Sequence, residues 1–374
     1  MLSSEQLSHC AEEVRRSSWR PRLPVLLTYL TSPPPADWML GISAAAHHLP
    51  LVLTAHGQRW DGFAGRLPSL RRAVEVIEHL TPGRAPPLIV VADGLDTMVV
   101  NPIDAAMPAL RSRQERTLPP SPFPLPPRRV RPEALTRGAP RAPSQPLTPA
   151  ADVLVGAECN SAPGCYIAMY AADGAHRACL ASSKACFANA GTYVGEPEPL
   201  RRAWEAIARA AAKGAGREHN DDQYGLHRLY LAQRAHNLSV RVDGESRVFL
   251  SLRECVRARI GARKRTKVCN YGSYDPMRFV RPAAGSTGLL FSAQADQAHR
   301  PLIAHANGYG NGTRERFQEL RRKLYGSSGP SHHSNPTAAS TLDSPVLLVD
   351  SVTSNARKIC EVVTLGSLIS SRKQ

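Results

Sequence analysis

Two carboxylates stand three residues apart at the end of an apolar run. The run is Pro-Leu-Ile-Val-Val-Ala over residues 87–92, and Asp93 and Asp96 follow it. Such a run, bounded by prolines and glycine, predicts a buried strand, and α/β sheets bind ligands beyond the carboxyl ends of their strands. Two acids there need a neutralising cation, for which a hard divalent metal is the natural candidate. Alternatively, Asp93 caps a turn and Asp96 faces solvent.

The elements that must position these acids alternate between strand and helix patterns. Residues 24–31 and 49–55 predict strands, and helices are expected over 38–46 and 69–80, before the run that ends at Asp93. This alternation is typical of an α/β fold with a mostly parallel central sheet flanked by helices. Further expected elements are helices over 200–212, 222–232 and 314–324 and strands over 301–304 and 345–349.

Motifs further along the chain extend this pattern. They are Leu-Val-Gly-Ala-Glu at 154–158, Ala-Asn-Ala-Gly-Thr-Tyr-Val-Gly at 188–195, Asn-Asp-Asp-Gln-Tyr at 220–224 and Pro-Leu-Ile-Ala-His-Ala-Asn-Gly at 301–308. In this order and rough spacing they resemble the glycosyltransferase domain of the procollagen lysyl hydroxylase and procollagen glycosyltransferase group. The resemblance covers about residues 23–326. It implies a GT-A-like nucleotide-sugar-binding fold that binds a UDP-sugar through Mn²⁺.

The resemblance assigns the metal and the catalytic acids. It implies that Asp93, Asp96 and His305 hold Mn²⁺, which suits carboxylates with one imidazole and neutralises a leaving diphosphate. It also implies that Asp221 and Asp222 lie near the acceptor, where they act as a base or stabilise an oxocarbenium-like transition state. Taken alone, His305 reads as an ordinary loop histidine, and the adjacent acids read as an N-terminal helix cap.

Two cofactor-binding residues are expected between the first strands and the acid pair. Trp60 matches a tryptophan near the nucleotide base, on which an exposed aromatic ring can stack. Its alternative role is to anchor the loop to the core. Arg71, or its neighbour Arg72, is expected near the phosphates.

The other cofactor-binding residues follow the acids. The resemblance places Asn189 and Gly191 in a turn facing the donor sugar, with a plain strand-end turn as the alternative. Asn307 and Gly308 belong to a loop whose small residues let the backbone approach a diphosphate. The chain departs from the resembled pattern at Ala162, Ala190 and Ala306.

Charge and proline content divide the 374 residues into expected regions. We expect an N-terminal tail at 1–22, the transferase domain at 23–326 and a mostly disordered tail at 327–374. The Pro- and Arg-rich stretch 111–149 predicts a disordered insertion within the domain. This stretch and 253–267 carry most of the net charge of +16. A non-catalytic polyanion-binding protein is therefore an alternative, although the sparse aromatic residues argue against nucleic acid.

The partners follow mainly from the resemblance. It implies UDP-galactose or UDP-glucose as donor and a hydroxylysine-type or other protein or glycan acceptor, without a hydroxylase domain. A metal-dependent phosphoesterase is a further alternative, which would need a second cluster of ligands. No apolar run is long enough for a membrane span.

The sequence leaves the cell compartment open. Residues 1–20 lack the apolar core of a signal peptide, whereas the resemblance suggests the lumen of the endoplasmic reticulum or Golgi. The eight cysteines contain no C-x-x-C pair, which argues against structural zinc. Four of them, within 159–186, suit either disulfides or reduced buried thiols.

Overall fold

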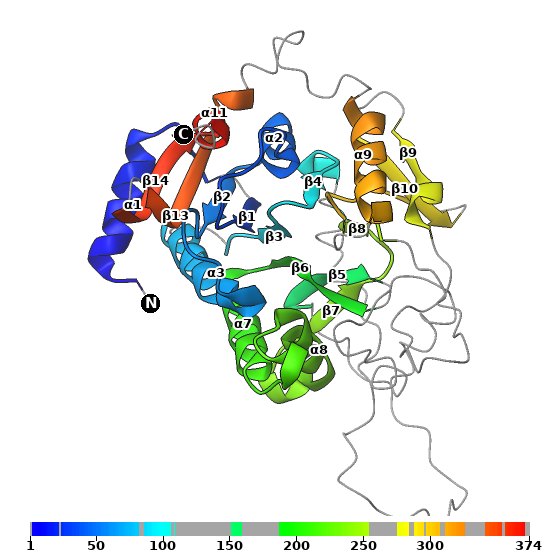
Figure 1. Ribbon diagram of the computed structural model, residues 1–374, viewed down its shortest axis with the longest axis horizontal. Helices are drawn as coiled ribbons and strands as arrows, with labels where there is room; N and C mark the ends of the chain where they lie inside the picture. The colour runs from blue at the N-terminus through cyan, green and yellow to red at the C-terminus, as the bar shows by residue number, and fades with distance from the viewer. Residues whose placement is uncertain are drawn as a thin grey trace, which may run out of the picture.

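An eight-stranded sheet forms the centre of the molecule, with the order β14-β13-β2-β1-β3-β6-β5-β7 (Figure 1). The computed structural model describes residues 2–21, 24–81, 86–105, 108, 151–158, 187–253, 275–283, 288–294, 297–306, 311–325, 341–353 and 356–370. The strands are β1 (Val25–Tyr29), β2 (Leu51–Thr54), β3 (Ile89–Asp93), β5 (Val153–Glu158), β6 (Phe187–Gly195), β7 (Val240–Asp243), β13 (Pro345–Thr353) and β14 (Ala356–Thr364).

Parallel pairing predominates in this sheet. The strand β1 lies parallel to β2 and β3, β13 lies parallel to β2, and β5 lies parallel to β7. The strand β6 is antiparallel to both β3 and β5, and β14 is antiparallel to β13. The predicted α/β class with a mostly parallel central sheet is therefore confirmed.

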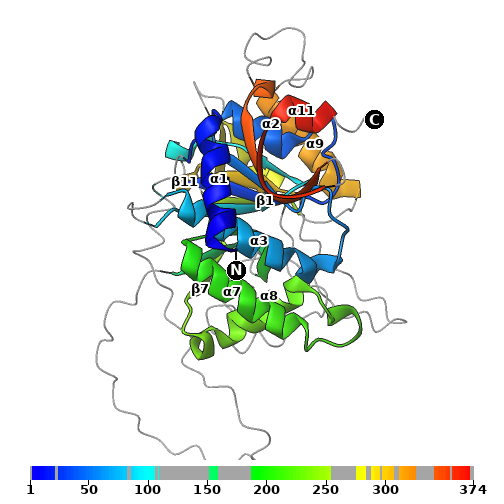
Figure 2. The same ribbon diagram turned by 90° about the vertical axis from the view of Figure 1, so that its left-hand side faces the viewer.

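Helices cover both faces of the sheet (Figure 2). Successive strand side chains alternate between faces, so Val25 and Leu27 join one apolar cluster and Leu26 joins another. None of the described helices has both the length and the apolar character that a membrane crossing requires. The first cluster includes α1 (Ser4–Arg16), α3 (Gly62–His79), α7 (Pro197–Ala211) and α8 (Asp222–Ala232); the second includes α2 (Met39–Ala46) and α11 (Leu365–Ser370).

Two three-stranded sheets lie beside the central one. The sheet β4-β12-β8 comprises Thr97–Val99, Ile303–His305 and Phe249–Ser251. The sheet β11-β10-β9 comprises Gln297–His299, Leu289–Gln294 and Val280–Pro282, and it shares a core with α9 (Asn311–Tyr325). Short 3₁₀ turns cover Gly216–Glu218, Gln233–His236 and Pro276–Phe279.

The predicted elements are present, with one boundary clearly displaced. The helix expected to begin at residue 69 begins at Gly62, so that Pro68 lies inside α3. Proline removes one helical hydrogen bond, but buried Arg66 and Leu67 fix the preceding turn against the core. Pro197 opens α7, where a missing N–H has no cost.

The two expected tails are wrong in the structure. Residues 1–22 contain α1, which Ser3 caps, and residues 327–374 contain β13, β14 and α11. The apolar run Val346–Val349, within the strand expected over 345–349, pairs with β2 and so joins the central sheet. A disulfide joins Cys10 of α1 to Cys360 of β14. The predicted insertion 111–149 and the four cysteines at 159–186 lie outside the described residues.

Candidate metal centre

Asp93, Asp96 and His305 come together at the carboxyl end of β3, an inner strand of the central sheet. Asp93 ends β3, Asp96 precedes β4, and His305 ends β12. The antiparallel pairing of β12 with β4 sets His305 opposite Thr97, and the Ala306 N–H donates to the Asp96 carbonyl at 2.7 Å. His305 Nε2 lies 3.5 Å from Asp93 Oδ2 and 3.4 Å from Asp96 Oδ1. The three residues thus form a candidate metal triad.

The backbone around the triad needs glycine at two places. A Cβ at Gly94 would lie 2.8 Å from the Tyr29 carbonyl, so the turn between the two acids packs directly on β1. A Cβ at Gly191 would lie 2.2 Å from His305 Cε1 and 2.5 Å from Asp93 Oδ2. Gly191, predicted as a cofactor-binding residue, therefore provides the space that the triad occupies.

The donor atoms of the triad fit one divalent cation. Neighbouring ligands around a cation bound at about 2.1 Å lie roughly 3.0–3.5 Å apart, which is close to the spacing of His305 from the two carboxylates. Burial lowers the pKa of His305, but Asp96 and Asp93 together raise it to about 10. A protonated imidazole thus balances the acids, and a bound metal would replace that proton.

The structure adds one residue to the site that the sequence patterns did not identify. Arg66 Nε donates to Asp222 Oδ2 at 2.5 Å and Nη2 donates to the Ala190 carbonyl at 2.6 Å. Its Nη1 forms an ion pair with Asp93. Burial raises the pKa of Asp93, but Arg66 and His305 outweigh it and hold that pKa below its usual range. A signal was present: Arg66 stands in the buried stripe of α3 at helical spacing from Leu70, Ala73 and Ile77.

The two candidate catalytic acids have different surroundings. Asp221 caps α8, and its Oδ1 accepts a hydrogen bond from the Tyr224 N–H at 2.8 Å, so the capping alternative is confirmed for this residue. Asp222 is buried at 2% exposure and reaches the triad through Arg66. Burial raises the pKa of Asp222 to about 6, against the opposing effect of Arg66.

A second polar group lies at the ends of β5 and β6. Gln223 Nε2 donates to Glu158 Oε1 at 2.9 Å, and its Oε1 accepts from the Ala190 N–H at 2.6 Å. Burial raises the pKa of Glu158 to about 7, although Arg253, 3.8 Å away, lowers it in part. Through Gln223 and the Ala190 backbone, Glu158 is connected to the Arg66 network.

Asn189 lies within β6 rather than at its end. The strand continues to Gly195, so the strand-end turn is wrong, but its pairing with β5 shifts between Val155 and Gly156. Asn189 Oδ1 accepts from the Gly191 N–H at 2.8 Å. The irregular segment therefore bends beside the triad, where Gln223 and Arg66 bind its backbone.

Trp60, a predicted cofactor-binding residue, is 48% exposed. Its ring contacts Tyr29 edge-on at 5.9 Å and Phe63 at 5.5 Å between centroids. Tyr29 is the neighbour of Asp93 across the sheet. The large hydrophobic side chains that stand exposed in the described part of the chain are Trp60, Phe63 and Leu95, and Leu95 lies in the sequence between Asp93 and Asp96. Trp60 and Phe63, which contact each other and are linked to Asp93 through Tyr29, form an exposed apolar rim.

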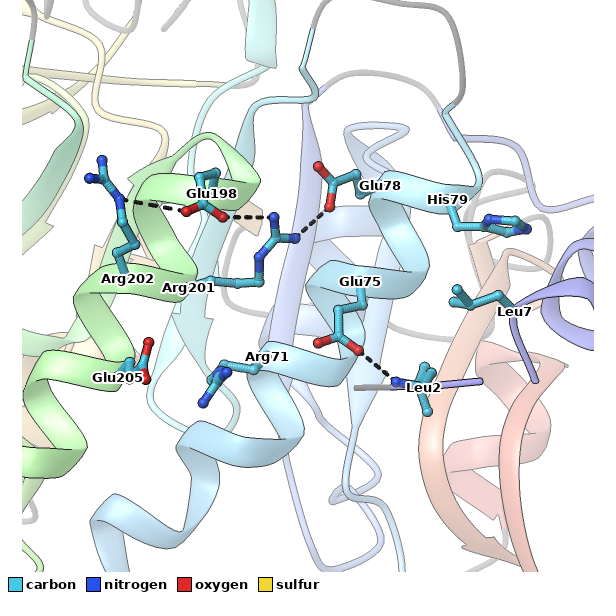
Figure 3. Close-up of a pocket in the computed structure, with 10 residues that line it drawn as sticks. All are labelled: Leu2, Leu7, Arg71, Glu75, Glu78, His79, Glu198, Arg201, Arg202 and Glu205. Carbon is cyan, nitrogen blue, oxygen red and sulfur yellow. Dashed lines mark hydrogen bonds and ion pairs between the residues drawn. The ribbon is translucent and has the colours of Figure 1, made fainter. Parts of the chain in front are cut away.

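The structure places Arg71 away from the triad. It follows Arg66 by five residues, about 140° around the helix, and lines a groove between α1, α3 and α7 with Glu75, Glu205 and others (Figure 3). None of the triad residues lines that groove. Arg72 instead binds Asp350. The arginine that reaches the acids is Arg66, and the predicted Asn307 and Gly308 lie outside the described residues.

Comparison of the sequence with known proteins finds no relative. No protein-family model matches the chain, and no curated protein matches it either. The resemblance to procollagen-modifying glycosyltransferases stays a prediction from the sequence motifs.

Proposed function

We propose that the chain is a metal-dependent glycosyltransferase that moves a hexose from a UDP-sugar to a hydroxyl acceptor. The observation that supports this most is the convergence of Asp93 and Asp96 with His305, which lies more than 200 residues further along the chain, around a space fit for one cation. A site of oxygen ligands with one imidazole suits Mn²⁺ or a similar divalent metal. Such a cation, when bound, supplies Lewis acidity toward a departing diphosphate.

Each part of the site has a role in this proposal. The exposed rings of Trp60 and Phe63 provide an aromatic surface on which a nucleobase stacks, next to the metal-bound phosphates. Asp222, which Arg66 holds close to Asp93, contributes negative charge near the reacting carbon, where it would stabilise an oxocarbenium-like transition state. Gly191 leaves room for His305 and Asp93, because a Cβ at this position would overlap both side chains.

The finer assignments follow from the sequence resemblance. We propose a GT-A-like arrangement for the α/β fold, galactose or glucose as the donor sugar, and a hydroxylysine-type acceptor in a collagen-like chain. The disulfide between Cys10 and Cys360 supports an oxidising compartment such as the endoplasmic reticulum or Golgi lumen.

The competing enzyme class has less support. A metal-dependent phosphoesterase with two metals needs a second cluster of ligands. Among the described residues, the triad is the single group of three or more side chains placed to hold a metal. Polyanion binding rests on 111–149 and 253–267, and deleting 111–149 would abolish that binding without stopping a transferase.

A panel of UDP-sugars tests the proposal. Hydrolysis or transfer is measured with Mn²⁺ or with EDTA, for the wild type and for Asp93→Ala. We expect turnover with one or two UDP-hexoses, lost with EDTA and in the variant. Asp37→Asn is the matched control, because Asp37 is an exposed acid paired with Arg321. Turnover that persists in EDTA or in Asp93→Ala rejects the proposal.

A further inference from the structure

With a divalent metal bound, the triad and its neighbour Asp222 would carry an excess of negative charge. Asp93, Asp96 and Asp222 bring three formal negative charges together; Asp222 is buried, and the side chains of Asp93 and Asp96 are 30% and 31% exposed. A divalent cation with neutral His305 supplies two positive charges, which leaves a net charge of −1. A diphosphate approaching that partly buried site would meet an excess of negative charge that water screens less than at an open surface.

Arg66 supplies the missing positive charge. Its side chain is 11% exposed, and its three nitrogens contact three different elements: Asp93 on β3, Asp222 on α8 and the Ala190 carbonyl on β6. A guanidinium carries five N–H groups in a planar fork, so these three contacts leave donors for a further oxygen. A lysine has the charge but lacks that fork.

We propose that Arg66 is the residue that lets the metal-loaded site accept a diphosphate, by cancelling the excess negative charge and by fixing Asp93 and Asp222 relative to each other. This inference rests on the proposed function only for the identity of the whole substrate, a UDP-sugar. The ligand that it requires is a diphosphate bound together with a divalent metal, whatever nucleoside the diphosphate carries.

Binding of Mn²⁺ and of Mn²⁺–pyrophosphate separates this role from that of the metal ligands. Calorimetry is performed on the wild type, on Arg66→Gln and on Arg72→Gln, the matched control that removes another ion-paired arginine from the same helix. We expect Arg66→Gln to bind Mn²⁺ as tightly as the wild type or more tightly, because a neighbouring positive charge is gone. We expect its affinity for Mn²⁺–pyrophosphate to fall at least about tenfold. Arg72→Gln keeps both affinities.

Chemical rescue provides a readout that a purely structural role would not change. In Arg66→Ala, added guanidinium, well below unfolding concentrations, is expected to restore much of the lost Mn²⁺–pyrophosphate affinity, whereas ammonium is not. If the alanine variant does not fold, Arg66→Lys replaces it. The lysine variant keeps the buried charge but not the fork, and we expect it to bind Mn²⁺–pyrophosphate at least several-fold more weakly than the wild type.

The outcomes distinguish this inference from the proposed function. Arg66→Gln binding Mn²⁺–pyrophosphate within twofold of the wild type overturns the inference, and so does loss of Mn²⁺ binding itself, which would make Arg66 a support for the metal only. Arg66-dependent binding of Mn²⁺–pyrophosphate by a wild type that turns over no UDP-sugar rejects the glycosyltransferase and keeps the inference. A wild type that does not bind Mn²⁺–pyrophosphate rejects the inference directly.

Discussion

Arg66 and Arg72 of helix α3 lie six residues apart, and each pairs with an aspartate in a different way. Arg72 binds Asp350, whose side chain is fully buried and also pairs with Arg357. Arg66 binds Asp93, whose side chain is 30% exposed and also faces His305. The first acid is enclosed by two arginines. The second belongs to a group in which carboxylates outnumber permanent cations.

This difference distinguishes a structural ion pair, at Asp350, from a candidate metal site, at Asp93. A buried carboxylate held by two arginines has its charge cancelled and has no need of a further cation. Burial raises the pKa of Asp350, but Arg357 and Arg72 outweigh it, and the pKa is lowered. Around Asp93, the nearby acids Asp222 and Glu158 have raised pKa values instead. Burial is the main cause of both shifts, and the negative charges of Asp93 and Asp221 raise the pKa of Asp222 further. A nearby cation stabilises buried carboxylates of this kind, and a metal would supply one.

The largest expected effect is on stability, at the enclosed acid. Asp350→Asn leaves Arg72 and Arg357 without their anion, and we expect the free energy of unfolding to fall by about 3 kcal/mol. Asparagine tolerates the positive φ of 53° found at this position, so backbone strain does not add to the loss. Denaturant unfolding measures it. Mn²⁺ affinity is expected to stay unchanged, and a loss of Mn²⁺ binding would erase the contrast between the two acids.

A smaller free-energy change, but a decisive one, is expected at the triad. Asp93→Asn removes one of three ligands, and the Mn²⁺ affinity should fall by at least about 100-fold, or ~2.7 kcal/mol. Arg66 keeps Asp222 as a partner, so stability changes little. Manganese titration followed by electron paramagnetic resonance measures the affinity, with Asp37→Asn as the control. Equal affinities in the two variants would refute the metal site.

The two acid environments also predict opposite pH dependences. The pKa of Glu158 is raised in the folded protein, so its contribution to stability is full below about pH 4.5 and is lost as the pH rises through about 7. The pKa of Asp350 is lowered, so its contribution is present above about pH 3.8 and is lost as the pH falls. Glu158→Gln should therefore gain on the order of 2 kcal/mol relative to the wild type between pH 5 and pH 8. Urea unfolding at both values measures this gain, and a constant difference would contradict the raised pKa.

The smallest expected effect is at the apolar rim. Trp60→Ala removes one stacking surface, and we expect UDP affinity in the presence of Mn²⁺ to fall about fivefold, or ~1 kcal/mol. The affinity for Mn²⁺–pyrophosphate, which has no base, should not change. Calorimetry with UDP and with pyrophosphate, each in the presence of Mn²⁺, measures the two affinities. An equal loss for both ligands would show that Trp60 supports the loop instead of the base.

The resemblance predicted the triad, and local signals agree with it. An apolar strand followed by two acids, and a short strand followed by His305, each indicate a strand end, and the carboxyl edge of a sheet gathers strand ends. Arg66 escaped because the helix was expected to begin at residue 69. Its place in the buried stripe of α3 is visible only when the helix is extended back to Gly62, and its partners on β3 and α8 follow from the fold. Arg71, the expected phosphate ligand, differs from Arg66 by five residues and therefore by helix face.

The pairing of the C-terminal strands with the central sheet escaped for a related reason. Residues 345–349 read as a strand, but nothing local indicates that it pairs with β2, whose sequence lies almost 300 residues earlier. Which strand pairs with which, over so large a sequence separation, depends on how the whole sheet assembles. The disulfide between Cys10 and Cys360 is equally invisible, because eight cysteines allow 105 pairings and spacing selects none of them.

That disulfide closes 350 residues of sequence separation into one covalent ring. A protease that cuts the ring once, for instance in the Pro- and Arg-rich stretch 111–149, leaves two fragments that are still one molecule. On a non-reducing gel the nicked protein therefore runs as a single band, and thiol splits it in two. Such a clip would leave the triad assembled, because Asp93 comes from one fragment and His305 from the other, and the sheet holds both.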